Sequence, residues 1–380
     1  MLRLAGRAAW RAFGDTDPNP MVGAVIARGG EVLAIGHHRR IGSIHAEADA
    51  IESARRRGVD IVGATMFVTL EPCAHRGKQP PCVGAIVAAG IGRVVIARRD
   101  PNPVAAGGAE ELRAAGVEVE VVEEPSAVLV GEPFCRRVMT GRAFVVAKWA
   151  QTVDGRVATR TGESKWISGE RARRRVHRLR SCVDAVFTGI GTVLADDPML
   201  TARGVPRLRR AARRVVADTD LDVSETAALV RTAREVPTTV LCEETLATAS
   251  ITAGKRRALE RAGVDVVGVR ATPRAGGRGI DLAHGLAVLG ERYGTASVMV
   301  EAGPGLLGSF FDAGLVDAAL VYVAPMLLGD ELARAAAAGR VAPTLSAGLR
   351  MQLIRAKRLG DDLELLYLAG RMSGKSDGVK

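Results

Sequence analysis

Aromatic residues are scarce in this chain of 380 residues, in which Phe, Trp and Tyr together make up 3%. Hydrophobic cores must therefore be built from Ala, Val, Leu and Ile, and the platforms on which nucleic-acid bases stack are missing. No hydrophobic run approaches the roughly 20 residues that a membrane-spanning helix requires. The N-terminus lacks a charged region followed by an apolar stretch and a cleavage site. We therefore expect a cytoplasmic protein that binds neither a membrane nor a nucleic acid.

Cysteine is also rare, with five residues in the chain. So few cysteines in a chain of this length exclude a disulfide framework. Cys73 and Cys82 lie close together in the sequence, and Cys135, Cys182 and Cys242 are isolated. We interpret the three isolated cysteines as small buried hydrophobic residues.

Positive charge is in excess, with a formal net charge of +11. Nucleic-acid binding is one explanation of such an excess. The arginines, however, follow expected helices at 55–57, 171–175 and 207–214, which favours solvated helix faces. Clustered positive charge also raises the local concentration of a phosphorylated small substrate. Charge alone does not decide between these interpretations.

The length predicts two domains, and 47% hydrophobic with 25% charged residues is typical of a folded soluble protein. Strand and helix patterns alternate, which predicts sheets layered with helices. In the first series we expect strands at 21–27, 32–35, 65–70, 93–97 and 117–122, with helices at 45–57, 81–89, 110–115 and 126–140. In the second we expect strands at 143–150, 185–188, 214–218, 238–241, 264–269, 297–300, 318–324 and 363–368. The expected domains are 1–142 and 143–370, with a surface loop or short helix at 330–342 and a disordered tail at 371–380.

The most informative pattern is His45-Ala46-Glu47 followed by Cys73 and Cys82. One histidine and two cysteines supply three zinc ligands, and a catalytic zinc site keeps its fourth position free for water. This is the pattern of hydrolytic zinc deaminases. Residues at i and i+2 do not share a helix face, so His45 and Glu47 can converge only if the first helical turn is incomplete. Glu47 would accept a proton from the water and pass it to the leaving amine.

A structural zinc site is the alternative, and it would need a fourth protein ligand. His75, two residues after Cys73, could be that ligand. Taken singly, His45 could also be a core or capping histidine, and Cys73 and Cys82 a pair of buried thiols. Glu47 favours the catalytic interpretation, because a structural zinc does not need a carboxylate that is not a ligand.

The spacing of the cysteines narrows the interpretation to a family. The common nucleobase deaminase motif has two residues between its cysteines, whereas this chain has eight. The stretch TLEPCAHRGKQPPC, with DPNPMVGAV upstream, resembles the bifunctional deaminase–reductases of riboflavin biosynthesis, and the resemblance runs from about Asp17 to Leu368. It implies a cytidine-deaminase-like α/β/α domain that acts on a diaminopyrimidinone carrying ribosylamine 5-phosphate. Ala74 and Gln79 stand where the family usually has serine and threonine.

The resemblance also implies residues that face the deaminase substrate. Asn19 would hydrogen-bond the pyrimidine, and His38 lies in the strand-to-helix loop. His75 and Lys78 lie in the loop between the cysteines, where Lys78 could reach the phosphate as a point charge. Without the resemblance, Lys78 would be interpreted as a solvated loop lysine.

The second half has glycine-rich stretches at 188–192 and 301–305, each after an expected strand. Neither is a G-x-G-x-x-G dinucleotide fingerprint, and alone each favours a tight turn. Stretches at 148–156, 162–168, 192–198 and 300–304 resemble the reductase half of the same family, which implies a dihydrofolate-reductase-like α/β domain that uses NADPH. The implied NADPH contacts are Ala150, Trp166, Thr192, Asp196, Thr219, Gly303, Pro304, Gly305, Leu306, Leu307, Gly308 and Ser309. The implied substrate contacts are Ser164, Arg180, Leu200, Arg203 and Glu301, with Lys148 as a weaker candidate.

The resulting hypothesis is a two-domain enzyme, a homodimer or larger by resemblance, that deaminates a phosphorylated pyrimidine and then reduces its ribosyl group. The two arginines of the reductase set suit the 5-phosphate. Hydride transfer from nicotinamide needs positioning more than acid–base groups. One alternative is a deaminase of a free base or nucleic acid with an accessory domain, which short cysteine spacing and stacking aromatics would favour. The other is a zinc-stabilised protein with an inactive reductase half.

Overall fold

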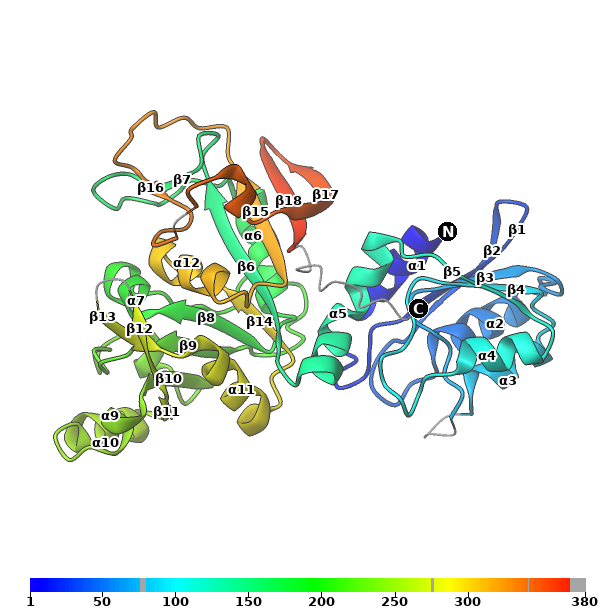
Figure 1. The fold of residues 1–380 in the computed structure, drawn as a ribbon, viewed down its shortest axis with the longest axis horizontal. Helices are drawn as coiled ribbons and strands as arrows, with labels where there is room; N and C mark the ends of the chain where they lie inside the picture. Colours follow the sequence, from blue (N-terminus) through cyan, green and yellow to red (C-terminus); the bar gives the residue numbers. More distant parts are fainter. Residues whose placement is uncertain (76–79, 275–276, 341, 370–380) are drawn as a thin grey trace. The chain divides into compact units, whose positions relative to one another are not determined.

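The computed structural model describes residues 1–75, 80–274, 277–340 and 342–369. The chain divides into two compact units, Met1–Phe144 and Val145–Lys380. Figure 1 colours the first unit from blue to cyan-green and the second from green to red. The expected tail at 371–380, Lys78 and Gln79 lie outside the described residues.

The first unit contains a five-stranded sheet in the order β2-β1-β3-β4-β5. Strand β1 pairs antiparallel with β2 and β3, while β3, β4 and β5 are parallel. The strands are β1 (Gly23–Arg28), β2 (Glu31–His37), β3 (Thr65–Val68), β4 (Arg93–Ile96) and β5 (Glu118–Val121). The helices are α1 (Leu2–Ala9), η1 (Trp10–Ala12), α2 (Ala46–Arg56), α3 (Cys82–Ala88), α4 (Gly108–Ala114) and α5 (Pro125–Thr140).

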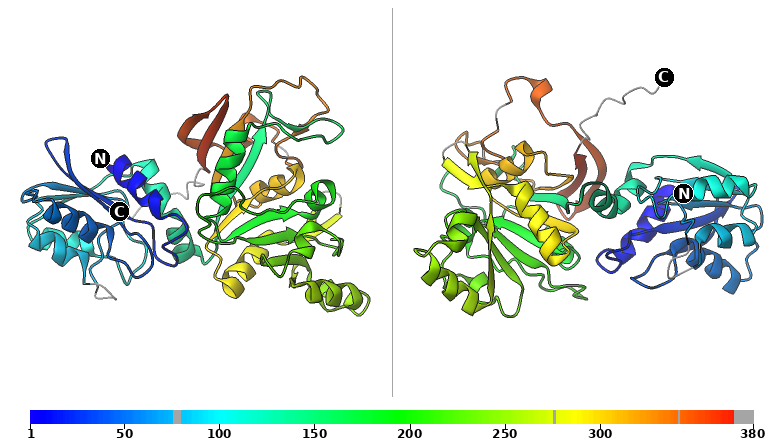
Figure 2. Two further views of the ribbon diagram at one scale, coloured as in Figure 1. Left: turned by 180° about the vertical axis from the view of Figure 1, so that it is seen from behind. Right: turned by 60° about the horizontal axis from the view of Figure 1, so that its bottom comes forward.

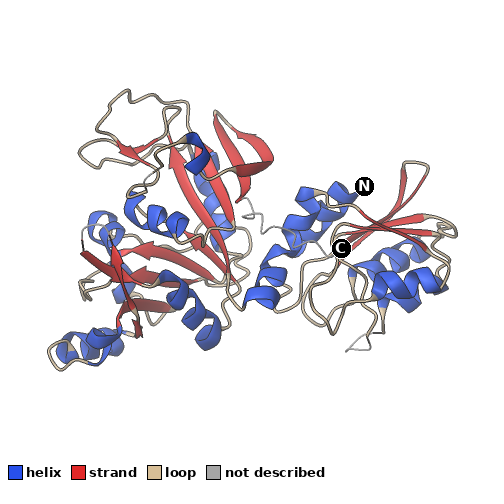
Figure 3. Ribbon diagram, viewed as in Figure 1, coloured by secondary structure: helices blue, strands red, loops and turns tan. Residues whose placement is uncertain are grey.

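Helices cover both faces of this sheet, as expected for an α/β/α domain (Figure 3). Successive residues of a strand point to opposite faces. In β4, Val94 therefore joins the core shared with α2, α3 and α4, whereas Val95 packs with Leu2 of α1 and Ala127 of α5. Strand β2 and helix α2 lie so close that a Cβ on Gly36 would be 2.3 Å from the Ala46 carbonyl oxygen. Glycine at this position lets α2, which carries the site residues, pack directly on the sheet.

The second unit contains a nine-stranded sheet in the order β11-β10-β9-β8-β14-β6-β15-β18-β17. Strands β11, β10, β9, β8 and β14 are parallel neighbours, β15 is parallel to β6, and β17 and β18 form an antiparallel edge. These strands are β6 (Phe144–Gln151), β8 (Ala185–Gly189), β9 (Arg213–Ala217), β10 (Thr238–Glu243), β11 (Val264–Val269), β14 (Ser297–Val300), β15 (Ala318–Val323), β17 (Met351–Leu359) and β18 (Asp362–Ala369). Two short ribbons pair β7 (Arg156–Ala158) with β16 (Arg334–Ala335), and β12 (Ala271–Arg274) with β13 (Gly277–Ile280).

Helices lie against this sheet as well (Figure 2). Ala172 and Val176 of one helix, α6, pack on Leu320 and Tyr322 of β15. The helices are α6 (Glu170–Arg180), α7 (Ile190–Asp196), α8 (Ala228–Arg231), α9 (Glu244–Thr248), α10 (Ala253–Ala262), α11 (Leu282–Tyr293), α12 (Pro304–Asp312) and η2 (Leu345–Ala347). Among the described residues, no helix has the length and apolar composition to span a membrane.

Two expectations about this unit are wrong. Residues 207–212 form neither helix nor strand, and β9 begins at Arg213. The β-branched pair Val215 and Val216 favours a strand there, and Arg214 is buried inside the unit rather than solvated. Cys182 is only partly buried at the end of α6, where its Sγ lies 3.2 Å from the Arg178 carbonyl oxygen, whereas Cys135 and Cys242 are buried as expected.

Candidate active sites

The three expected zinc ligands converge in the first unit. His45 is the residue before α2, Cys73 follows β3, and Cys82 begins α3. Their ligand atoms all lie within 4.8 Å of one another, with His45 Nδ1 3.3 Å from Cys82 Sγ and 3.5 Å from Cys73 Sγ. Tetrahedral zinc with nitrogen and sulfur ligands separates those atoms by about 3.5–3.8 Å. The donor set and its spacing therefore fit zinc.

The first turn of α2 brings His45 and Glu47 to the same site. His45 has an extended backbone, with φ −72° and ψ 163°, and Glu47 is the second residue of the helix. Residues i and i+2 point to different sides of a regular helix, but His45 lies outside the helix. His45 and Glu47 can therefore converge, which fits the expected incomplete first turn.

Glu47 is buried beside the ligands without belonging to their cluster. Burial, followed by the nearby negative charge of Cys73, raises the pKa of the Glu47 carboxyl to about 7. A carboxyl group in this range can both accept and release a proton near neutral pH.

The two cysteines interact directly. The hydrogen bond from the Cys82 thiol is the main cause that holds the pKa of Cys73 well below its usual range. The backbone N–H of Cys82, 3.4 Å from Cys73 Sγ, and the His45 ring act in the same direction. The thiolate form that results is the form that binds a metal.

Two of the four expected substrate residues lie at the cluster. Asn19 Nδ2 is 3.5 Å from His38 Nε2, and the His38 and His45 rings meet edge to face with centroids 5.6 Å apart. His75 is exposed and does not belong to the metal cluster, so the geometry favours an open fourth zinc position. Lys78 lies outside the described residues.

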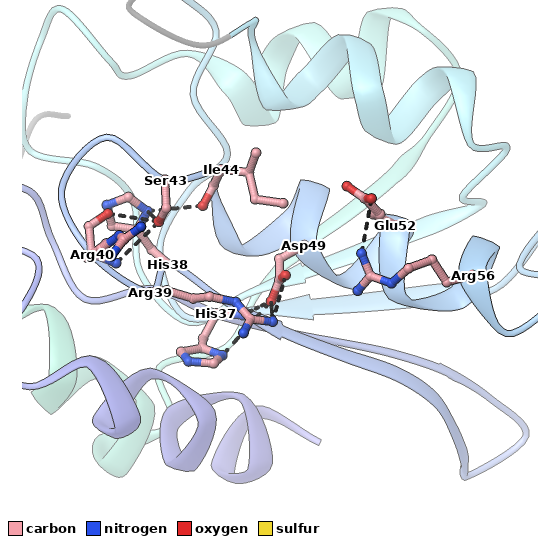
Figure 4. A network of polar contacts seen from close by, with 9 residues as sticks. All are labelled: His37, His38, Arg39, Arg40, Ser43, Ile44, Asp49, Glu52 and Arg56. Carbon is pink, nitrogen blue, oxygen red and sulfur yellow. Dashed lines mark hydrogen bonds and ion pairs between the residues drawn. The ribbon is translucent and has the colours of Figure 1, made fainter.

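A polar network that the sequence did not reveal supports the loop between β2 and α2 (Figure 4). The buried carboxylate of Asp49 accepts hydrogen bonds from the His37 backbone N–H at 3.1 Å and from Arg39 Nη2 at 3.1 Å. Within the loop, His38 Nδ1 lies 3.1 Å from the Ile44 carbonyl oxygen and Ser43 Oγ donates to the Arg40 carbonyl oxygen. The network ties the strand end that carries His38 to the helix that carries Glu47.

Glu71 holds the segment that leads to Cys73, as Asp49 holds the loop between β2 and α2. Its buried carboxylate accepts hydrogen bonds from the backbone N–H of Asp100 at 3.0 Å and of Ala109 at 2.9 Å. The loop that reaches Cys73 two residues later is thereby fastened to α4 and to the segment after β4. A charged residue directly after an apolar strand is the sequence signal that could have indicated this contact.

We expect Glu71→Gln to lower zinc affinity by about 10–100-fold, the usual effect of losing a group that orients a ligand. A glutamine can accept only one of the two N–H groups and turns its own N–H₂ toward the other. Zinc affinity is measured by competition with a chelator. Glu110→Gln is the control: it is an exposed change on α4 that removes the ion pairs with Arg99 and Arg113 but leaves both hydrogen bonds of Glu71 to the backbone in place. Equal zinc affinity in the two variants would show that Glu71 does not position the ligand.

In the second unit, several implied cofactor residues lie at the carboxyl ends of neighbouring strands. Thr192 and Gly303 follow the parallel strands β8 and β14, and the Gly303 N–H donates to Thr192 Oγ1 at 3.2 Å. Ala150 is near the end of β6, and Thr219 follows β9. Open α/β sheets bind ligands at such ends. Helix α12 begins after Gly303, and a Cβ on Gly305 would meet no atom within 4 Å, which leaves room for a phosphate of NADPH.

The remaining implied cofactor residues differ in exposure. Trp166 is 66% exposed, and the Arg173 guanidinium lies 4.6 Å from the centroid of its ring. Asp196 pairs with Lys165 at 3.2 Å, which links α7 to the loop that carries Trp166. Pro304, Leu306 and Ser309 are partly buried, and Ser309 Oγ donates to the Gly305 carbonyl oxygen. Leu307 and Gly308 are buried and face the packed side of α12.

The implied substrate residues centre on Glu301. Its carboxylate forms two bonds with Arg180, from Nε at 2.6 Å and Nη2 at 3.0 Å, and Lys148 Nζ lies 3.3 Å away. Burial alone would raise the pKa of Glu301, but the charges of Arg180 and Lys148 outweigh it and lower the pKa to about 2.

The other three substrate residues are placed as follows. Leu200 is buried with φ 51°, Arg203 is exposed, and Ser164 is partly buried on the loop before α6. Arg180 Nη1 donates to the carbonyl oxygen of Thr201 at 3.1 Å, which joins Glu301 and Arg180 to the 200–203 segment.

The metal cluster and the nine-stranded sheet define a zinc-dependent deaminase joined to a dihydrofolate-reductase-like reductase. The family "Cytidine and deoxycytidylate deaminase zinc-binding region" matches residues 1–98, and the family "RibD C-terminal domain" matches residues 143–365. The chain belongs to the RibD family, the bifunctional deaminase–reductases of riboflavin biosynthesis. Zinc serves the first domain of this family and NADPH the second.

Individual relatives match along nearly the whole chain. The riboflavin biosynthesis protein RibD of Actinobacillus pleuropneumoniae is 37% identical over 97% of this chain and 94% of its own length. The solved structure of Acinetobacter baumannii RibD, form 1, is 34% identical, covers 97% of this chain and 98% of its own, and has a TM-score of 0.72. The diaminohydroxyphosphoribosylaminopyrimidine deaminase/5-amino-6-(5-phosphoribosylamino)uracil reductase from Thermotoga maritima is 32% identical, covers 97% of each chain, and has a TM-score of 0.73.

Proposed function

We propose that this chain catalyses two consecutive reactions on one molecule. The first is the hydrolytic deamination of 2,5-diamino-6-ribosylamino-4(3H)-pyrimidinone 5′-phosphate. The second is the NADPH-dependent reduction of the ribosyl group to ribityl. The observation that carries the proposal is the His45, Cys73 and Cys82 cluster with Glu47 buried beside it, in a chain that also contains the reductase domain. The name of the Thermotoga maritima relative supports the substrate.

In the deaminase site, His45, Cys73 and Cys82 would hold zinc, which acts as a Lewis acid and lowers the pKa of water. Glu47 accepts the proton of the attacking water and returns it to the leaving amine. Asn19 and His38 adjoin the cluster and bind the pyrimidine edge. In this proposal Lys78 and the exposed His75 face the substrate, and Lys78 binds its phosphate.

In the reductase site, NADPH supplies the hydride. The loop 303–309, Ala150, Trp166, Thr192, Asp196 and Thr219 would hold the cofactor. Ser164, Arg180, Leu200, Arg203 and Glu301 hold the substrate so that its reacting carbon meets the nicotinamide, and holding two reactants in contact supplies much of the rate enhancement. Three nitrogen atoms of Arg180 already donate hydrogen bonds to Glu301 and to the Thr201 carbonyl oxygen. The exposed Arg203 is therefore the better candidate for the phosphate.

Incubation of the purified protein with the diaminopyrimidinone phosphate tests this function. Without NADPH we expect one product, in which oxygen replaces an amino group. With NADPH that product should disappear in favour of one that has also gained a hydride and a proton. Mass spectrometry distinguishes the three compounds. An unchanged substrate under both conditions, with cytosine or cytidine deaminated instead, would contradict the proposal.

The assembly and location are proposed on the same basis. The family resemblance supports a homodimer or larger homo-oligomer, and the scarcity of aromatic residues supports a small-molecule substrate rather than a nucleic acid. We place the reactions in the cytoplasm. Light scattering during size-exclusion chromatography measures the oligomeric state directly.

A further inference from the structure

His177 lies on α6, one helical turn before Arg180. The helix is fixed on the sheet by Ala172 and Val176, which pack against β15 (Figure 1). Residues i and i+3 are neighbours on a helix surface, so the His177 ring and the Arg180 guanidinium approach the same segment. That segment, 200–203, is part of a stretch from 197 to 212 that has neither helix nor strand.

The Nδ1 atom of His177 meets two backbone groups of this segment. The Arg203 N–H donates to Nδ1 at 3.2 Å, and the Thr201 carbonyl oxygen lies 3.1 Å from the same atom. The Thr201 oxygen already accepts a hydrogen bond from Arg180 Nη1. A neutral ring with its proton on Nε2 therefore satisfies both backbone groups, because Nδ1 is then free to accept from Arg203.

The charges that face the ring favour this neutral form. The pKa of His177 is lowered, first by burial and then by the positive charges of Arg180 and Arg203. The Thr201 carbonyl oxygen and the carboxylate of Glu301 oppose this shift without reversing it. At neutral pH the ring consequently remains an acceptor for the Arg203 N–H.

We propose that His177 is a positioning residue for the reduction, and that its Nδ1 holds the 200–203 segment so that the Arg203 guanidinium is ready to bind the 5-phosphate of the substrate. This inference rests on the proposed reductase function and adds to it a residue that touches neither substrate nor cofactor. Holding a binding segment in its bound conformation before the ligand arrives lowers the entropic cost of binding. Leu200, with φ 51° in the left-handed region, shows that this backbone is held in a conformation that a free segment would rarely adopt.

Two substitutions distinguish the hydrogen bond made by His177 Nδ1 from the effect of the size and packing of the ring. In His177→Asn the side-chain amide can occupy the place of Nδ1 and still accept from the Arg203 N–H. In His177→Gln the amide reaches the place of Nε2 instead. We expect His177→Gln to raise KM for the phosphorylated substrate by about 5–10-fold, the effect of one hydrogen bond, with kcat within about twofold. His177→Asn should remain near the wild type.

Two further measurements compare KM for substrates with and without the 5-phosphate, and KM at neutral and acidic pH. The substrate without its 5-phosphate should show the same KM in both variants and the wild type. Protonation of His177 turns Nδ1 into a donor, so the contact is complete above the ordinary pKa of 6.5 and is lost as the pH falls through the lowered pKa. The wild-type KM should therefore rise at acidic pH more than the KM of His177→Asn. The titration of the substrate phosphate, with a pKa near 6, is common to both proteins and cancels in the comparison.

The experiment measures NADPH oxidation in the full chain, together with the binding of ribose 5-phosphate by calorimetry. Deamination by the first unit is the internal control for folding and should be unchanged in all variants. Weaker binding of ribose 5-phosphate by His177→Gln, with normal binding by His177→Asn, would support the positioning role of His177. Failure of the wild type to reduce the proposed substrate would count against the proposed function alone and would leave this binding result valid. Equal binding in both variants and the wild type would overturn the positioning role, as would an equal loss on the substrate that lacks phosphate.

Discussion

Glu47→Gln should reduce deamination by about 10²–10⁴-fold, the usual contribution of a positioned general acid–base group, and leave NADPH-dependent reduction unchanged. Glutamine has nearly the same shape as glutamate, but it cannot accept the proton of the attacking water. Glu47 is buried next to the cluster without being a ligand. Zinc should therefore stay at about one atom per chain. The measurements are the rate of amine release, the zinc content, and the rate of NADPH oxidation with the deaminated substrate.

Two variants control this result. Glu52→Gln changes a partly exposed carboxylate on the same helix that pairs with Arg55 and Arg56, and it should leave all three quantities unaltered. Cys82→Ser removes a ligand and should lose zinc and deamination together. If Glu47→Gln lost its zinc, or lost reduction as well as deamination, then Glu47 would have a structural role rather than the proposed proton transfer.

Arg214→Lys should destabilise the second unit by about 3–5 kcal/mol, the range for breaking a network of buried hydrogen bonds to a charged group. Arg214 is fully buried, and burial lowers the pKa of its guanidinium to about 10, so it remains charged at neutral pH. Within the described part of the chain, its nitrogen atoms donate to neutral oxygen atoms. The acceptors are Thr238 Oγ1, Thr232 Oγ1 and the carbonyl oxygens of Leu229, Val236 and Met199.

Lysine keeps the positive charge but has three donors in place of five, so buried oxygen atoms lose their partners. The free energy of unfolding is measured with urea, following the fluorescence of the tryptophans of the second unit. Arg257→Lys, an exposed change on α10, should alter it by no more than about 0.5 kcal/mol. Similar stability of the two variants would show that the charge of Arg214, rather than its planar set of donors, is what the fold requires.

The clustering of the three candidate zinc ligands could be predicted from the sequence because each ligand is marked locally. His45 and Cys82 stand at the beginnings of helices, and Cys73 follows a strand, so the short motifs themselves place the ligands at the ends of secondary structure elements. The structure confirms that these ends meet. Asn19 and His38, which the family resemblance identified, also lie at the cluster.

The supporting groups could not be predicted because their partners are distant in the sequence. Glu71 meets Ala109, 38 positions away, and Arg214 meets Thr238 after a crossover between parallel strands. A pattern of neighbouring residues contains no information about such partners. This is also why the arginines at 207–214 were wrongly assigned to a solvated helix: the sequence shows that Arg214 is charged, but not that carbonyl and hydroxyl oxygens surround it.

His177 is a related case. The reduction needs little acid–base chemistry, so no sequence pattern in the second half of the chain indicated a role for a histidine. In the structure, the Nδ1 atom of His177 contacts the backbone of Thr201 and Arg203. A backbone contact depends on where that segment lies, which only the tertiary structure determines.

The division into two units has an evolutionary consequence. All residues of the metal cluster and Glu47 come from Met1–Phe144, whereas Glu301, its partners Arg180 and Lys148, and residues 303–309 come from Val145–Lys380. A recombination breakpoint at Gly141, just past the end of α5, would thus exchange one activity without dividing the residues of either site. Each half can in this way be inherited, duplicated or lost as a genetic module, and natural selection can act on its chemistry separately.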